Sequence, residues 1–351
     1  MVRQYCYEFC FGRAIFSCAA AMISCMLVAQ DTYDLDRARQ RAREGYVEDQ
    51  LKLGRAFLAG SGVPRDPAES ARWFLQAANQ GNPEAQTDLG YAYSRGDGVS
   101  QDFHEAFKWF QRAALSGYSP AQNDLGVLLV QGLGAPRDTS AGVSWVVRAA
   151  HQGLAAAELH LGLFYLSGIG VQADLHEAVG WIRKAAKKQY PEAEFALGMI
   201  YEEGRGVPAD FAQAARWYRK AAEHGQRSAQ NNLGHLYEKG RGVREDFAQA
   251  IHWYNLAADQ GEVMAWQNLA RVYAGVSSFP LDNTWAYFWA RVTARAAPDR
   301  AQKNWPAFVE LLRNRLSVEA AQRVDASAEQ WIQEHRSEVD QQELIFAFNQ
   351  R

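Results

Sequence analysis

The sequence predicts an all-α protein, built as a solenoid of about seven helical hairpins that are each 36 residues long. Two residue patterns with the same period carry this prediction. The dipeptide Leu-Gly occurs at Leu53-Gly54, Leu89-Gly90, Leu125-Gly126, Leu161-Gly162, Leu197-Gly198 and Leu233-Gly234, with Leu269-Ala270 as a seventh copy. Tryptophan follows as Trp73, Trp109, Trp145, Trp181, Trp217, Trp253 and Trp289. One hairpin cannot bury its apolar face alone, so stacked neighbours must share a continuous core.

The composition is that of an ordinary folded protein. The chain has 351 residues, of which 48% are hydrophobic and 22% are charged. The net charge of −3 gives no signal for binding nucleic acid. All four cysteines lie within the first 25 residues, so neither a disulfide framework nor a cysteine-ligated zinc site is expected after them.

Residues 1–29 have the pattern of a secretory signal peptide. Arg3 and Arg13 precede an apolar run, Ala14–Ala29, that ends in a small residue. Its 16 residues would span about 24 Å as a helix, less than the roughly 30 Å of a bilayer's hydrocarbon core. Cleavage is expected after Ala29. Two alternatives stay open, namely lipid attachment at Cys25 and an uncleaved anchor.

Residues 30–45 are interpreted as an incomplete first repeat, and residues 46–297 as seven complete ones. In the second copy, apolar residues three and four apart predict a first helix over Pro83–Arg95. Gly96 is expected to end that helix in the left-handed conformation. Asp102 is expected to cap the second helix, which Gly117 closes.

Two departures from the repeat are informative. Gln189 stands where other copies have the closing glycine, and a left-handed glutamine would cost about 1 kcal/mol. Residues 298–336 no longer follow the pattern and are interpreted as a C-terminal cap of two longer helices, Ala301–Leu316 and Val318–Glu334, with Ser317 as the second N-cap. The tail, residues 337–351, contains the short apolar run Leu344–Phe348, which is expected to pack on the cap or to dock a partner.

These hairpins resemble the Sel-one-like repeat family, which is related to the tetratricopeptide repeat. The shared pattern is A-x-x-x-L-G-x-x-Y, then G-x-G-V-x-x-D, then A-x-x-W-x-x-x-A-A-x-x-G, and the copy Leu197–Gly225 matches it throughout. The resemblance implies a right-handed α-α superhelix and a role as an adaptor between proteins. Bacterial members include envelope lipoproteins, export scaffolds, signalling regulators and secreted virulence factors. A cysteine-rich branch has been linked to β-lactam binding, but the repeats of this sequence contain no cysteine.

No motif for catalysis or for a cofactor is found. The patterns G-x-S-x-G, S-x-x-K, H-E-x-x-H and G-x-x-x-x-G-K-[ST] are all missing from the sequence. The histidines show no metal-binding spacing with a carboxylate on one helix face. We therefore expect no catalytic residues, no metal and no cofactor.

In tetratricopeptide-like solenoids the first helix of each hairpin lines a concave groove. Two columns of residues, spaced four apart on that helix, are predicted to line it. The candidate partner-binding residues are Arg55, Tyr91, Leu159, Leu163, Phe195, Met199, His235 and Arg271. Leu159, Leu163, Phe195 and Met199 would form an apolar centre with a polar rim. Alternatively, the curvature of the solenoid buries these four against the adjacent helix.

The sequence therefore favours a non-catalytic scaffold that is exported to the bacterial cell envelope. Its expected partner is a protein or peptide in the groove, with no nucleic acid. Membrane contact is expected only through the N-terminal signal or a lipid anchor. The protein is expected to be a monomer. Its expected location is the periplasm or the cell envelope, or it is secreted. Two alternatives are a cell-wall or β-lactam hydrolase, which a fluorescent β-lactam would label, and a secreted effector that binds a host protein.

Overall fold

The computed structural model describes residues 35–275, 280–301 and 303–335. The predicted signal peptide, Cys25 and the apolar run of the tail lie outside these residues. The described residues form α-helices and one short 3-10 helix, and no strand occurs among them. Within this part of the chain, no helix is both long enough and apolar enough to cross a bilayer.

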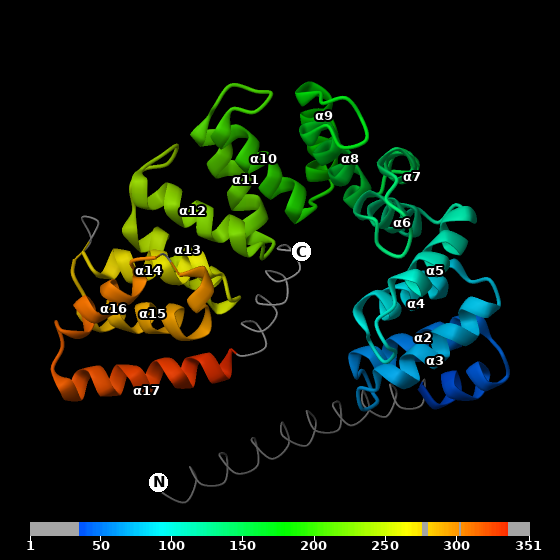
Figure 1. The fold of residues 1–351 in the computed structure, drawn as a ribbon, viewed down its shortest axis with the longest axis horizontal. Helices are drawn as coiled ribbons and strands as arrows, with labels where there is room; N and C mark the ends of the chain where they lie inside the picture. Colours follow the sequence, from blue (N-terminus) through cyan, green and yellow to red (C-terminus); the bar gives the residue numbers. More distant parts are fainter. Residues whose placement is uncertain (1–34, 276–279, 302, 336–351) are drawn as a thin grey trace, which may run out of the picture. The chain divides into compact units, whose positions relative to one another are not determined.

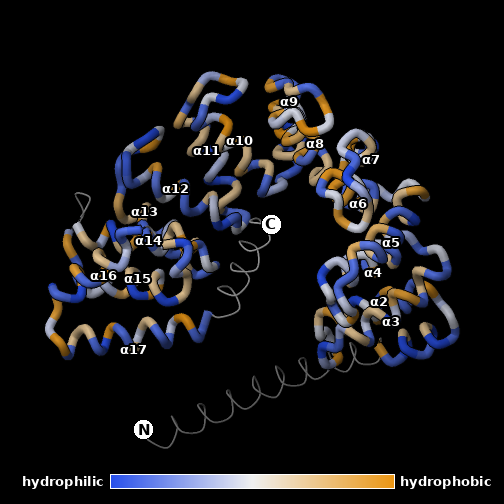
Figure 2. Tube along the Cα trace, viewed as in Figure 1, coloured by the Kyte–Doolittle hydropathy of each residue, from blue (hydrophilic) through white to orange (hydrophobic). Residues whose placement is uncertain are grey.

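The chain divides into two compact units, each of which is a stack of antiparallel helical hairpins (Figure 1). The first unit runs to Ala157 and includes Ile169–Val171, and the second comprises Glu158–Gly168 and the chain from Gln172 onward. Hydrophobic residues recur along the hairpins of both units instead of gathering in one centre (Figure 2). This distribution is expected of a repeat protein, in which each hairpin packs mainly on its neighbours.

The first unit contains a helical stretch over residues 35–43 and then three hairpins. Their helices are α2 (Val47–Ala59), α3 (Pro67–Asn79), α4 (Pro83–Arg95), α5 (Phe103–Leu115), α6 (Ser119–Gln131) and α7 (Thr139–His151). Even-numbered helices up to α14 are called A helices and odd-numbered helices up to α15 are called B helices. The predicted first helix of the second copy, Pro83–Arg95, is confirmed at both ends.

The second unit contains the remaining hairpins and the C-terminal cap. Its helices are α8 (Ala155–Ser167, whose first residues belong to the first unit), α9 (Leu175–Lys187), α10 (Pro191–Glu203), α11 (Phe211–Glu223), α12 (Arg227–Lys239), α13 (Phe247–Asp259), α14 (Val263–Tyr273), α15 (Asn283–Ala296), the 3-10 helix η1 (Pro298–Arg300), α16 (Trp305–Arg313) and α17 (Val318–Glu334). The helices α14 and α15 form the predicted seventh hairpin.

The helix ends confirm the local predictions. The carboxylate of Asp102 accepts hydrogen bonds from the backbone N–H groups of His104 and Glu105, at 2.8 and 3.1 Å, and so caps α5. Gly96 ends α4 with a φ of 79°. Gln189 is the non-glycine residue with a positive φ, 60°, in the described part of the chain. The glutamine therefore adopts the left-handed conformation that the sequence predicted for it.

The Leu-Gly dipeptide sets the distance between the two helices of a hairpin. A Cβ atom placed on Gly90 would lie 2.7 Å from the Phe110 ring of the facing helix. In the second unit, a Cβ atom on Gly198 would lie 2.3 Å from the ring of Tyr218. Any side chain at these positions would push the helices apart, because interiors are close-packed.

The C-terminal cap packs through aromatic rings and ion pairs. The Trp331 ring of α17 meets those of Trp289 and Trp266, with centroids 5.4 and 5.8 Å apart. The carboxylate of Asp325 accepts a hydrogen bond from the Tyr287 hydroxyl at 3.0 Å and lies 2.6 Å from Nε of Arg291. The helices α15 and α17 therefore share one core, as the prediction of a capping pair requires.

One predicted helix was too long. The sequence predicted a helix over Ala301–Leu316, whereas α16 begins at Trp305, ends at Arg313 and has only 9 residues. Pro306 occupies the first turn, where the fixed φ of proline and its missing N–H are tolerated. The short 3-10 helix η1, Pro298–Arg300, ends just before the predicted start at Ala301. The second predicted helix, Val318–Glu334, and its cap Ser317, whose hydroxyl accepts from the Ala320 N–H at 3.2 Å, are confirmed.

Candidate functional site

The eight predicted groove residues all lie on A helices. Arg55 is on α2 and Tyr91 on α4, in the first unit; Leu159 and Leu163 are on α8, Phe195 and Met199 on α10, His235 on α12 and Arg271 on α14, in the second. We call these eight residues the A-helix columns. The structure shows what each of them contacts within its own unit.

Arg55 joins two consecutive A helices. Its guanidinium lies 3.0 Å from the carboxylate of Glu84 and 3.0 Å from that of Asp88, both on α4. Burial raises the pKa of the Asp88 carboxyl, and the charge and hydrogen bond of Arg55 oppose this shift. Arg55 therefore acts first as a bridge between repeats, with about half of its side chain exposed to a partner.

Tyr91 makes the corresponding contact one repeat further on. Its hydroxyl donates a short hydrogen bond to the carboxylate of Asp124 on α6, and the guanidinium of Arg95 lies 5.2 Å from the centre of its ring. Burial raises the pKa of Asp124, while its hydrogen bonds from Tyr91 and Asn123 act in the opposite direction. Burial, followed by the nearby charge of Asp124, also raises the pKa of the Tyr91 hydroxyl.

The apolar quartet in the second unit is partly used by the protein's own packing. Leu159 is buried, with 7% of its surface exposed, whereas Leu163, Phe195 and Met199 are half-buried. The Phe195 ring lies 5.8 Å from that of Tyr218, and both Phe195 and Met199 pack against the core cluster that contains Tyr218. Leu163, Phe195 and Met199 therefore keep part of their apolar surface exposed, whereas Leu159 is buried in the protein's own core.

Polar side chains continue the columns on α12 and α14. The amide of Asn268 donates to the side-chain oxygen of Asn231 at 2.9 Å, and Arg271 donates to the side-chain oxygen of Asn268 at 2.9 Å. His235 is half-buried, and burial lowers the pKa of its imidazole, with the charge of Glu238 opposing the shift. This end of the columns offers amides, an imidazole and a guanidinium beside the apolar edges of α10.

Sequence reasoning missed a column of part-buried polar pairs that recurs from repeat to repeat. Its members pair a residue on one A helix with a residue just after the B helix of the same repeat. The pairs are Gln50–Gln80, Gln122–Gln152 and Gln230–Gln260, each at 2.8 Å, and, also at 2.8 Å, the charged versions Glu158–Lys188 and Glu194–His224. The glutamines of the A helix also donate to a backbone carbonyl of the preceding B helix, as Gln230 does to Ala222 at 3.1 Å. Polar residues recur at intervals of 36 from Gln50 and from Gln80, and this recurrence could have revealed the pairs.

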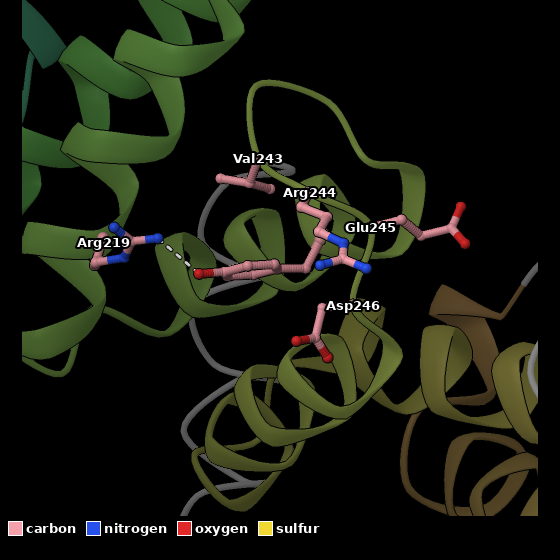
Figure 3. A pocket seen from close by; sticks show the side chains of 6 residues that line it. Arg219, Val243, Arg244, Glu245 and Asp246 are labelled. Atoms are coloured by element: carbon pink, nitrogen blue, oxygen red, sulfur yellow. Dashed lines mark hydrogen bonds between the residues drawn. The ribbon is translucent and has the colours of Figure 1, made fainter.

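The second unit also contains an open hollow beside α12, which sequence reasoning did not predict. It is lined by Arg219 of α11, Tyr237 of α12 and the loop residues Val243–Asp246, and it encloses about 600 Å³ (Figure 3). Nη2 of Arg219 donates to the Tyr237 hydroxyl at 2.6 Å. Elsewhere among the described residues, no group of three or more His, Cys, Asp or Glu side chains is arranged to hold a metal ion.

The stacked hairpins define the protein as an α-solenoid with an extended surface made of repeats. Six consecutive matches to the Sel1 repeat cover residues 47–82, 83–118, 119–154, 155–190, 191–226 and 227–262. The chain therefore belongs to the Sel1 repeat family. Sel1 repeat proteins are typically scaffolds for protein–protein interaction and are generally non-catalytic. The seventh hairpin, α14 and α15, lies outside the six matches.

The first of two similar solved structures supports the same fold. A Sel1 repeat protein from Oxalobacter formigenes is 32% identical, with a TM-score of 0.64, over 82% of this chain and 85% of that one. A protective antigen of uropathogenic Escherichia coli that displays an SLR fold is 24% identical, with a TM-score of 0.47, over 87% of this chain and 88% of that one. No curated protein sequence matches the chain significantly.

Proposed function

We propose that the protein is a monomeric, non-catalytic scaffold, exported to the bacterial cell envelope, that holds a partner protein or peptide along its A helices. The observation that carries this proposal is the surface of the second unit. The half-buried apolar edges of Leu163, Phe195 and Met199 are followed along the same columns by His235 and Arg271. An apolar centre beside a polar rim suits a helix or an extended segment of a partner.

Export is supported by the sequence of residues 1–29. A basic flank precedes an apolar run that is too short to span a bilayer easily. The mature mass of the protein purified from cells distinguishes the three possible N-termini. These are cleavage after Ala29, lipid at Cys25 and a retained anchor.

The partner surface is tested by crosslinking in cells and pull-down through a C-terminal tag. The triple variant Leu163→Ala/Phe195→Ala/Met199→Ala should lose the partner that the wild-type protein captures, because it removes the apolar edges. A matched control, Leu175→Ala/Leu256→Ala, truncates exposed leucines of B helices in the same unit and should keep the partner. Capture is compared per folded molecule, with folding measured by circular dichroism. Equal capture by both variants would contradict the proposed surface.

A further inference from the structure

The hollow beside α12 is lined by two arginines, of which Arg244 departs from the repeat pattern. Arg244 lies in the loop before α13, and Arg219 lies on α11. The other repeats have Pro64, Ser100, Pro136, Gln172, Pro208 and Pro280 at the position of Arg244, and Leu75, Gln111, Val147, Arg183, Asn255 and Arg291 at the position of Arg219. Two arginines therefore line the same hollow at this one junction of the repeat array.

Neither arginine forms an ion pair within 4.0 Å with a carboxylate of the described residues, although Glu245 and Asp246 also line the hollow. Arg219 donates to the Tyr237 hydroxyl, which fixes its guanidinium at the edge of the hollow (Figure 3). The side chain of Glu245 points away from Arg219 in this view. Asp246 is occupied as the cap of α13, accepting from the Gln249 N–H at 3.0 Å. The remaining N–H groups of two guanidiniums are thus available to an anion.

The lining indicates which kind of anion fits. Guanidinium groups bind carboxylates and phosphates through paired N–H donors. Glu245 and Asp246 also line the hollow, and their charge would oppose a doubly charged phosphate more than a singly charged carboxylate. Val243 and the ring of Tyr237 add an apolar wall that suits the methylene group of an acidic side chain.

We propose that this hollow binds a carboxylate side chain from an acidic segment of a partner protein. The inference rests on the proposed function, because it takes the partner to be a protein, but it assigns a second surface. Tyr237 follows His235 by two positions on α12, which places the two side chains about 200° apart around the helix. The hollow and the A-helix columns therefore face different directions on α12.

The test uses a fluorescein-labelled hexaglutamate peptide as the probe, with binding to the full chain followed by anisotropy at low salt. Arg219→Gln/Arg244→Gln should weaken binding by about tenfold or more, because it removes two charge-assisted contacts. The matched control is Arg183→Gln. It removes the equivalent arginine of the preceding repeat, which donates to Tyr201 at 3.3 Å beside a loop that carries Pro208 instead of arginine. The control should bind hexaglutamate as the wild-type protein does.

Three results would overturn the inference. They are unchanged binding by the double variant, an equal loss in Arg183→Gln, and stronger displacement of hexaglutamate by inorganic phosphate than by acetate at the same ionic strength. Circular dichroism melts verify that each variant is folded. The proposed function fails separately, when the triple variant of the A-helix columns captures its partner as the wild-type protein does. If the double variant still binds hexaglutamate while the triple variant loses its partner, only the carboxylate site is refuted.

Discussion

At the scale of single residues, Gln189 shows how firmly the repeat imposes its backbone. The closing position of the hairpin requires a positive φ, which the glycines at this position adopt readily, as Gly225 does at 84°. Gln189 adopts 60° at the same position, although a side chain makes that conformation unfavourable. The packing on both sides of the turn therefore outweighs a local preference of about 1 kcal/mol.

Gln189→Gly should stabilise the second unit by about 0.5–1 kcal/mol, because it relieves the left-handed strain. The reverse change is available one repeat later. A Cβ atom on Gly225 would meet no atom within 4 Å, so Gly225→Ala introduces the same strain without a clash and should destabilise the unit by about 1 kcal/mol. Urea unfolding of both variants measures the difference. Equal stability of Gln189→Gly and the wild type would contradict the argument.

A second prediction at this scale concerns pH. Burial lowers the pKa of His235 below its ordinary value of 6.5, and the nearby charges of Glu238, Lys239, Glu202 and Arg241 modify that shift. The unfolded chain binds a proton at a higher pH than the folded chain does. The contribution of His235 to stability is therefore present above pH 6.5 and is lost as the pH falls toward the lowered value. His235→Gln should make the free energy of unfolding fall less between about pH 7.5 and about pH 5.5. An identical fall in the free energy of unfolding of His235→Gln and of the wild-type protein would refute this prediction.

At the scale of the element, the polar pair that joins the A helix of a repeat to the end of its B helix exists in a neutral and a charged form. Gln122–Gln152 pairs two amides, whereas Glu158–Lys188 pairs two charges at the same distance of 2.8 Å. The carboxylate of Glu158 is nearly buried, and its second oxygen has no hydrogen-bond partner within the described structure. Removing one partner of a buried ion pair leaves the other charge unpaired. The stability of the unit therefore depends on keeping both Glu158 and Lys188, or neither.

The charged pair gives a sharp test by a double-mutant cycle. Lys188→Gln alone should destabilise the second unit by about 1–3 kcal/mol, because the buried carboxylate of Glu158 loses its ammonium partner. Glu158→Gln/Lys188→Gln should recover most of that loss by recreating the amide pair seen at Gln122–Gln152. Thermal and urea unfolding of the wild type, both single variants and the double variant measure the coupling. If the effects of the two single substitutions add up to the effect of the double variant, the coupling is excluded.

The elements show what sequence could and could not predict. The ends of α4 and the cap at Asp102 were predicted correctly because each signal recurs at the same place in many copies. The helix expected over Ala301–Leu316 had no second copy to compare, and Pro306 moved its start to Trp305. The column of polar pairs was missed because a single glutamine in a sequence is typical of a surface residue. Its role becomes visible only when its period of 36 and its burial are known. Residues lining the hollow come from three elements, which no local pattern connects.

At the scale of the whole molecule, contacts run mainly between neighbouring hairpins, so a local defect should stay local. The cap at the C-terminal end closes the array through edge-to-face contacts of the Trp331 ring with the rings of Trp266 and Trp289. Removing one of these rings should loosen the last hairpin first and leave distant hairpins intact.

Trp331→Ala should raise amide hydrogen exchange in α14, α15 and α17 by at least about tenfold, because it removes the ring that α17 packs against Trp266 and Trp289. Exchange in α2–α7 of the first unit should stay as in the wild type. Hydrogen exchange measured by mass spectrometry resolves the two regions. A uniform increase over both units would show that the array unfolds as a single cooperative body.

The loop glycines have a further consequence for how such a chain can change over generations. A Cβ atom on Gly98 would lie 2.0 Å from the carbonyl oxygen of Pro67, one hairpin earlier, and one on Gly134 would lie equally close to that of Phe103. These two loops therefore pack directly against the start of the preceding B helix, where a side chain would clash. Recombination that adds or removes one whole copy preserves this fit, whereas a gain or loss of a few codons destroys it. The array of hairpins can thus lengthen or shorten only by whole repeats.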